Sequence, residues 1–252
     1  MITRIELTNY LHDLLGCDSF NDYAPNGLQV EGMPEIGIIC TAVTASAKVI
    51  DEAAKMNASA LLVHHGYFWR GESPVITGMK YQRIVRLLQH KMNLFAYHLP
   101  LDCHLNFGNN ACLGKLLGLQ SITQHTAGNT PNLLWAGSLP TAMTAEALNE
   151  WLTKQLHRKP QHIAGNDRLI KRIAWCSGSA QDFITKAHEL DVDAYLSGEI
   201  SERTYYEAKE LGIHYFACGH HATERLGIRA LGGHLSQHFG LPHHFIDSDN
   251  PV

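Results

Sequence analysis

Residues 61–69 read LLVHHGYFW, an apolar run that ends on two adjacent histidines and a glycine. The run predicts a buried β-strand over 59–65, and neighbouring side chains on a strand point to opposite faces. Packing against one face of the sheet therefore cannot supply hydrogen-bond partners for both His64 and His65. At a strand end they can reach two different ligands; the alternative is a pair held by backbone carbonyls or solvent.

Short apolar runs and amphipathic helical runs alternate along the rest of the chain. The predicted strands are 36–43, 59–65, 93–98, 133–140, 170–178, 194–199 and 213–221, with a last strand at HHFID. The predicted helices are 46–57, 79–92, 108–119, 181–191, 201–212 and 224–239, together with one at the N-terminus and one capped by Thr144. This alternation predicts an α/β protein.

Two parts of the pattern match each other when one is shifted along the chain. A shift of 134 residues places Ile36, Ile39, Ile50, Ala53, Ala60 and Leu62 over Ile170, Ile173, Ile184, Ala187, Ala194 and Leu196. A shift of 122 then places His98 over His220 and Asp102 over Glu224. We therefore predict two similar α/β halves related by an internal repeat, residues 1–126 and 127–252, with 127–168 as a connecting strand–helix segment and a metal site in the cleft between the halves.

Composition and the absence of common motifs argue against several functional classes. The chain has 252 residues, of which 45% are hydrophobic and 17% charged, and a net charge of −4, so no basic field directs it to nucleic acid or an anionic membrane. Its six cysteines are widely spaced without a C-x-x-C pair, which predicts reduced thiols and a cytoplasmic protein. There is no glycine-rich phosphate loop and no G-x-S-x-G elbow, so kinase, dehydrogenase and serine-hydrolase functions lose support.

Imidazoles and carboxylates gather where predicted strands end, the edge at which α/β folds bind ligands. The candidate metal ligands are His64, His65, His98, Asp102, His220 and Glu224. Taken singly, His98 and His220 are better explained as packed histidines and Asp102 and Glu224 as helix-start acids, but the matched spacing favours a metal centre. This donor set suits zinc, iron, manganese or nickel, and two ions per chain fit it better than one, since a catalytic ion keeps a position for water.

Several neighbouring residues receive secondary roles. Glu199 takes the place of His65 in the repeat and is a candidate catalytic base or hydrogen-bond acceptor behind a ligand. We expect His104, His214 and His221 to lie behind the ligands or on the surface. The aromatic residues Tyr67, Phe68 and Trp69 are expected to serve packing first and a platform for a planar ring second.

Five motifs together resemble the NIF-three-like dinuclear-metal family, also called the GTP cyclohydrolase I type 2 family, in its bacterial YbgI branch. They are NGLQV (26–30), VHHGYFW (63–69), HLPLD (98–102), SGE (197–199) and GHHATE (219–224). The resemblance implies that His64, His65, Asp102, His220 and Glu224 are metal ligands, joined by His98, and that the chain forms a hexameric toroid. Many members have threonine directly after the histidine matched by His98, where this chain has Leu99.

The leading functional hypothesis is a hydrolase that uses two divalent ions to activate water against a nucleotide-like small molecule. For GTP the reaction would open the imidazole ring and release formate. A dinuclear phosphoesterase acting on nucleotides or nucleic acid is one alternative. A metal-binding scaffold or interaction protein without catalysis is the other.

Overall fold

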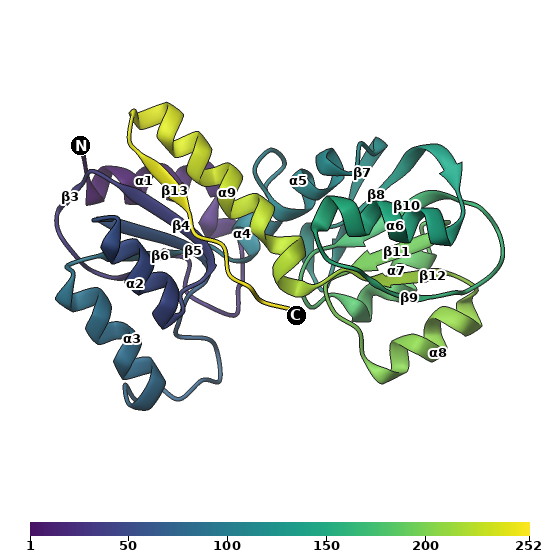
Figure 1. Ribbon diagram of the computed structural model, residues 1–252, viewed down its shortest axis with the longest axis horizontal. Coiled ribbons are helices and arrows are strands. Elements are labelled where there is room, and N and C mark those ends of the chain that lie inside the picture. The colour runs from purple at the N-terminus through teal and green to yellow at the C-terminus, as the bar shows by residue number, and fades with distance from the viewer. The chain divides into compact units, whose positions relative to one another are not determined.

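The computed structural model describes residues 1–252, which form two compact units (Figure 1). Unit 1 contains Met1–Leu101 and Gly227–Asp249, and unit 2 contains Asp102–Leu226 and Asn250–Val252. Each unit is built on one main sheet flanked by helices, so the α/β prediction is confirmed. None of the helices combines the length and the apolar character that crossing a bilayer requires.

The sheet of unit 1 has the strand order β13-β4-β5-β6-β2 (Figure 1). Its strands are β2 (Gly27–Val30), β4 (Ile39–Thr44), β5 (Ala60–His65), β6 (Asn93–Ala96) and β13 (His243–Phe245). All neighbours are parallel except β2, which runs antiparallel to β6. Helices α1 (Arg4–Leu15), α2 (Ala47–Lys55), α3 (Gly78–Gln89), α4 (Leu99–Asp102) and α9 (His220–Phe239) accompany it, and β1 (Ile2–Thr3) pairs with β3 (Glu35–Ile36).

Side chains of β5 alternate between two apolar cores. Leu61 and Val63 belong to the core that α2 and α3 cover, whereas Ala60 and Leu62 belong to the core that α1 and α9 cover. This alternation follows from the pleat of the strand. The two histidines that end β5 therefore start from opposite faces of the sheet, as the sequence predicts.

The sheet of unit 2 has the order β7-β8-β10-β11-β12-β9. Its strands are β7 (Gln120–Ala127), β8 (Thr130–Met143), β9 (Gln161–Ile163), β10 (Ile170–Cys176), β11 (Ala194–Ser197) and β12 (His214–Ala217). The central β10-β11-β12 are parallel, and the outer strands are antiparallel to their neighbours. The helical segments are α5 (Asn109–Leu116), α6 (Ala145–Leu156), η2 (Gln181–Phe183), α7 (Ile184–His188) and α8 (Glu202–Leu211), with η1 (Cys17–Ser19) in unit 1.

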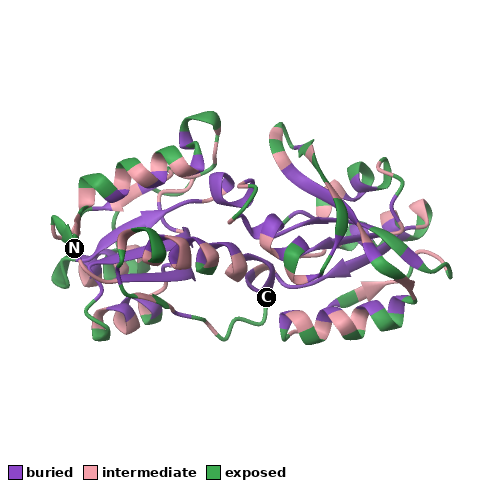
Figure 2. Cartoon of the chain, turned by 90° about the horizontal axis from the view of Figure 1, so that it is seen from above, coloured by how far each residue is buried: buried purple, intermediate pink, exposed green.

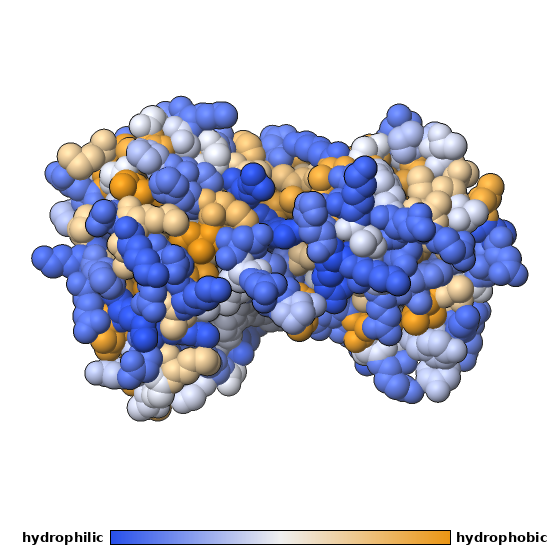
Figure 3. Space-filling model, viewed as in Figure 1, coloured by the Kyte–Doolittle hydropathy of each residue, from blue (hydrophilic) through white to orange (hydrophobic).

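Burial explains why these segments form where they do. Figure 2 shows buried residues along the strands and exposed residues along one side of most helices, and Figure 3 shows mainly hydrophilic residues on the face in view, with apolar ones in small groups. Helix α6 illustrates the pattern, because Leu148, Leu152 and Leu156 recur every four residues and pack into the core of unit 2. Its predicted cap is confirmed: the Thr144 hydroxyl accepts a hydrogen bond from Ala147 N at 3.2 Å.

The two units share strand register where the repeat predicts it. Ile39 lies opposite Ala60 in unit 1, and Ile173 lies opposite Ala194 in unit 2, which corresponds to the predicted shift of 134. For the third strand of each unit, β6 and β12, the observed shift is 121 rather than the predicted 122, because Asn93 and His214 occupy equivalent places. One more residue thus separates β12 from His220 than separates β6 from His98.

The division of the chain differs from the predicted halves at 126 and 127. The first unit stops at Leu101 and regains residues 227–249, because Ile228, Leu231 and Leu235 of α9 are buried in the same core as α1. Strand β13 then pairs with β4 and completes the sheet of unit 1. The structure also adds the strands β1, β2, β7 and β9, and begins α9 at His220 rather than Glu224.

Candidate metal centre

His64 lies at the end of β5 and is buried, with 1% of its surface exposed. Its Nδ1 is 2.9 Å from the carbonyl oxygen of Tyr97. A carbonyl only accepts, so Nδ1 carries the proton and the lone pair of the ring lies on Nε2. The neighbouring His65 is half-buried, and its Nδ1 lies 3.3 Å from the Thr44 hydroxyl on β4. Both rings are thus oriented through Nδ1.

His98 follows β6 and is held by Asp22, a residue that the sequence analysis did not select. The Asp22 Oδ1 lies 2.7 Å from His98 Nδ1, and only 3% of the Asp22 side chain is exposed. Burial by itself would raise the pKa of Asp22, but the hydrogen bond and charge of His98, with bonds from Asn26 and Leu99, lower it to about 2. The carboxylate is therefore ionised at neutral pH and directs the Nε2 of His98 away from itself.

The three imidazoles of unit 1 form one cluster. The ring centroid of His64 lies 4.7 Å from that of His65 and 5.1 Å from that of His98. One nitrogen of each ring lies within 4.8 Å of the others, which is close enough for all three to hold a metal ion. Imidazole nitrogens with fixed tautomers are the ligands that zinc, iron, manganese and nickel accept. The structure thus brings together the three histidines that the sequence predicts for this unit.

In unit 2, His220 and Glu224 lie one helical turn apart in the first turns of α9. Their Nε2 and Oε2 atoms are 3.1 Å apart, and only 3% of the Glu224 side chain is exposed. The Glu199 Oε1 lies 2.6 Å from the other ring nitrogen of His220. Burial by itself would lower the pKa of His220, but Glu224 and Glu199 raise it to about 9. Two carboxylates around one imidazole make this group a strong binder of positive charge.

Asp102, the last residue of α4, supplies a second buried carboxylate in unit 2, with 5% of its surface exposed. Its Oδ1 accepts hydrogen bonds from Asn109 Nδ2 at 2.8 Å and from the Ser177 hydroxyl at 3.2 Å. A carboxylate oxygen of Asp102 lies within 4.8 Å of one of Glu224. Two carboxylates this close repel each other unless a cation or a proton lies between them. This donor set therefore also fits a divalent ion.

Glu199 contacts a predicted ligand and also a neighbouring hydroxyl. Besides its bond to His220, its Oε2 accepts from the Ser179 hydroxyl at 3.1 Å. The carboxylate thus mirrors Asp22, which contacts the same nitrogen of His98. Its position suits the acceptor behind a ligand, and its catalytic role stays a prediction.

Of the three further histidines that the sequence singles out, one differs from its predicted place. His214 begins β12, whereas His220 follows the other end of that strand, so the expectation that His214 lies behind a ligand or on the surface is wrong. It is 2% exposed, and its Nδ1 lies 3.1 Å from His162 Nε2 on β9. His221 is buried, which excludes the surface but not a place behind a ligand, and its backbone N–H donates to the Val252 carbonyl. The Nδ1 of His104 accepts from the N–H groups of Asn106 and Phe107.

Two glycines allow the backbone of unit 2 to approach these side chains. A Cβ on Gly178 would lie 2.3 Å from Glu224 Oε1. A Cβ on Gly198, in the SGE motif, would lie 2.6 Å from the Gly178 carbonyl oxygen and 2.7 Å from the Cα of His220. The Gly198 contacts are to backbone, which cannot rotate away as a side chain does.

We therefore expect Gly198→Ala to destabilise the protein by about 1–3 kcal/mol through overpacking. The measurement is the free energy of unfolding in urea, in metal-free protein. Gly233→Ala in α9 is the matched control, since nothing lies within 4 Å of the added methyl and a helical alanine is favoured by up to about 1 kcal/mol. Equal unfolding midpoints for the two variants would contradict the crowding at Gly198.

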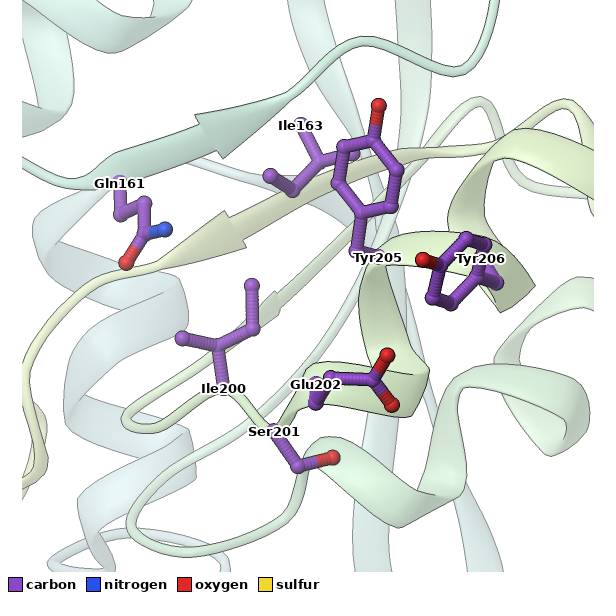
Figure 4. A pocket seen from close by; sticks show the side chains of 7 residues that line it. All are labelled: Gln161, Ile163, Ile200, Ser201, Glu202, Tyr205 and Tyr206. Carbon is purple, nitrogen blue, oxygen red and sulfur yellow. The ribbon is translucent and has the colours of Figure 1, made fainter.

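A separate cavity of about 380 Å³ lies beside β9 and α8 in unit 2 (Figure 4). It is lined by Gln161, Ile163, Ile200, Ser201, Glu202, Tyr205 and Tyr206. Figure 4 shows the Tyr205 ring beside Ile163 and the Glu202 carboxylate beside the two tyrosines. The lining contains no histidine and one carboxylate, so it suits an apolar or hydrogen-bonding group rather than a metal ion.

The chain is similar over its whole length to known proteins and to solved structures. The model of the family described as Duf34/NIF3 (NGG1p interacting factor 3) matches residues 2–251. A protein of Vibrio cholerae named "GTP cyclohydrolase 1 type 2 homolog" is 47% identical over 253 residues, covering 100% of both chains. The solved structure described as "protein ybgI, unknown function" is 44% identical with a TM-score of 0.95, and TTHA1606 from Thermus thermophilus is 32% identical with a TM-score of 0.90; each covers 100% of both chains.

Proposed function

Because the chain belongs to the Duf34/NIF3 (NGG1p interacting factor 3) family, we propose that it is a divalent-metal-dependent hydrolase acting on a nucleotide or a related small molecule. One observation carries the proposal. Two of the three clustered imidazoles of unit 1 have Nδ1 bound by a carbonyl or a carboxylate acceptor, an orientation typical of histidines that bind metal through Nε2. Packing alone does not require such a cluster.

Each unit supplies its own donors in this proposal. His64, His65 and His98 would hold metal from unit 1, and Asp102, His220 and Glu224 would hold metal from unit 2, with two ions per chain in total. When bound, such ions supply Lewis acidity, which activates water at neutral pH and stabilises developing negative charge. The metals that this donor chemistry favours are zinc, iron, manganese and nickel.

The remaining polar residues orient donors or move protons. Asp22 and Glu199 each hold the Nδ1 proton of a donor histidine, so the ring cannot turn its lone pair away from an ion. Asn109 and Ser177 donate to one oxygen of Asp102 and so orient its carboxylate. Glu199, part of whose side chain reaches solvent, is the group we propose to carry protons to and from the substrate.

The substrate hypothesis takes its first candidate from the relatives, several of which are named "GTP cyclohydrolase 1 type 2 homolog". We propose GTP as the first substrate to test, with opening of the imidazole ring and release of formate as the reaction. Hydrolysis of phosphate esters and a metal-binding scaffold without turnover remain the competing functions. The predicted hexamer also stays a proposal, and sedimentation equilibrium tests it.

The test is mass-spectrometric detection of products from GTP, with protein loaded separately with manganese, iron and zinc. Formate together with a ring-opened or pterin product is the expected result, at a rate that depends on metal. If phosphate is the only product, the cyclohydrolase hypothesis is rejected in favour of the phosphoesterase hypothesis. No product from GTP or from bis-nitrophenyl phosphate with any metal would overturn the hydrolase proposal and leave the scaffold.

A further inference from the structure

The loop that follows the two histidines of β5, residues 66–70, contains three consecutive aromatic residues with different surroundings. Tyr67 is 4% exposed, and its hydroxyl donates to the Ala45 carbonyl oxygen at 2.7 Å. Phe68 packs against the core covered by α2 and α3. These two rings serve packing. Trp69 does not belong to that core and remains partly exposed.

Trp69 lies against two of the proposed metal ligands. The centroid of its ring is 5.0 Å from that of His98, with the planes at 83°, and 5.8 Å from that of His65, with the planes at 57°. Neither contact is a parallel stack, so neither imidazole lies flat against the indole. The residue is partly exposed, so a ligand can reach it from solvent beside these two imidazoles.

Several contacts hold the backbone of this loop in place. The Gln29 side chain accepts from Tyr67 N at 2.7 Å and donates to the Tyr67 carbonyl oxygen at 3.1 Å, as a neighbouring strand would. Arg70 donates from its backbone N–H to the Tyr23 carbonyl oxygen and from its guanidinium to the Asp22 carbonyl oxygen. The segment that orients His98 thus also anchors the loop that carries Trp69.

The loop includes a backbone conformation that its sequence disfavours. Phe68 has a φ of +66°, in the left-handed region that bulky residues rarely adopt. Such conformations persist where surrounding contacts impose them, and they cluster at binding sites. Glu72 adds to these contacts, since its Oε2 accepts from Trp69 N at 3.2 Å while its carboxylate pairs with Lys80 at 3.0 Å. The contacts on both sides of Phe68 therefore serve to place Trp69.

We propose that Trp69 is the stacking platform for a planar heteroaromatic ring of the substrate, such as a purine base, beside His65 and His98. This inference rests on the proposed function and names the part of the substrate that the site recognises. An indole stacks on any aromatic base through its flat face. The metal donors next to it would then face the same end of the ligand that carries the heterocycle.

The experiment uses zinc-loaded protein labelled with 5-fluorotryptophan, in which the four tryptophans of the chain give four ¹⁹F signals. The Trp69 signal is assigned with Trp69→Phe, and GMP is titrated against ribose 5-phosphate, which lacks the ring. GMP is expected to shift the Trp69 signal, and ribose 5-phosphate is not. In calorimetry, Trp69→Leu should bind GMP about 5- to 150-fold more weakly than the unsubstituted protein, with unchanged zinc content.

Trp151→Phe is the matched control, since Trp151 is also partly exposed but lies on α6 in the other unit. It should bind GMP with unchanged affinity. Unchanged binding by Trp69→Leu, or no binding of GMP by the unsubstituted protein, would overturn the platform. The titration needs no turnover, so it can fail independently of the hydrolase proposal. If product forms from GTP but the Trp69 signal does not shift, only the stacking proposal is rejected. If the Trp69 signal shifts but no product forms, only the hydrolase proposal is rejected.

Discussion

Replacing Glu224 by glutamine is expected to weaken metal binding and turnover by about 100- to 1000-fold each, while the fold is retained. The substitution keeps the shape of a side chain that is 3% exposed but removes the charge next to His220 Nε2. Loss of an anionic ligand costs several kcal/mol of charge stabilisation, and each 1.4 kcal/mol or so is about tenfold. Metal content by mass spectrometry and the GTP product assay measure the two effects.

An additional measurement separates loss of the metal site from general damage. Glu224 helps to raise the pKa of His220 to about 9, so the pKa of that imidazole should fall in metal-free Glu224→Gln, as followed by NMR. Glu210→Gln on the exposed side of α8 is the control and should leave metal content, turnover and the His220 titration unchanged. Normal metal content and activity in Glu224→Gln would show that Glu224 is not a ligand.

Replacing Asp22 by asparagine is expected to lower metal affinity by about 10- to 100-fold, as removal of the acceptor behind a ligand does. Asp22 Oδ1 accepts from Tyr23 N at 2.6 Å and lies 2.7 Å from His98 Nδ1. Its Oδ2 accepts from Asn26 Nδ2 at 2.8 Å and Leu99 N at 2.9 Å. An asparagine must present an NH₂ to one pair of these donors, so we also expect a loss of about 1–3 kcal/mol of stability.

The imidazole of His98 reports directly on this change. With an amide group next to Nδ1, the tautomer of His98 should shift toward Nε2–H, which ¹⁵N chemical shifts of the metal-free protein detect. The control is Asp18→Asn, because Asp18 also pairs with a histidine, His12, but its side chain is 90% exposed. That surface pair should contribute at most about 1 kcal/mol and leave metal affinity unchanged. An unaltered His98 tautomer with full metal affinity would make Asp22 a purely structural residue.

The sequence by itself determined the alternation of strands and helices and the positions of the donor residues at strand ends. Both are local properties: apolar periodicity marks β5 and α6, and His64 and His65 interrupt an apolar run within a few residues. The cap at Thr144 is local in the same sense, since a hydroxyl three residues before an N–H can close the helix start. Sequence pattern is a sound guide wherever the interaction lies within one element.

Only the tertiary structure decided the partners that orient those donors. Asp22 meets His98 across 76 residues, and Ser177 meets Asp102 across 75, and no periodicity encodes such pairs. Strands β2 and β9 were not predicted, because a segment of three or four residues becomes a strand only by pairing with a neighbouring strand. The return of α9 to unit 1 likewise depends on the core into which Ile228 and Leu231 pack, because burial of an apolar face is settled by whatever surface the folded chain offers it.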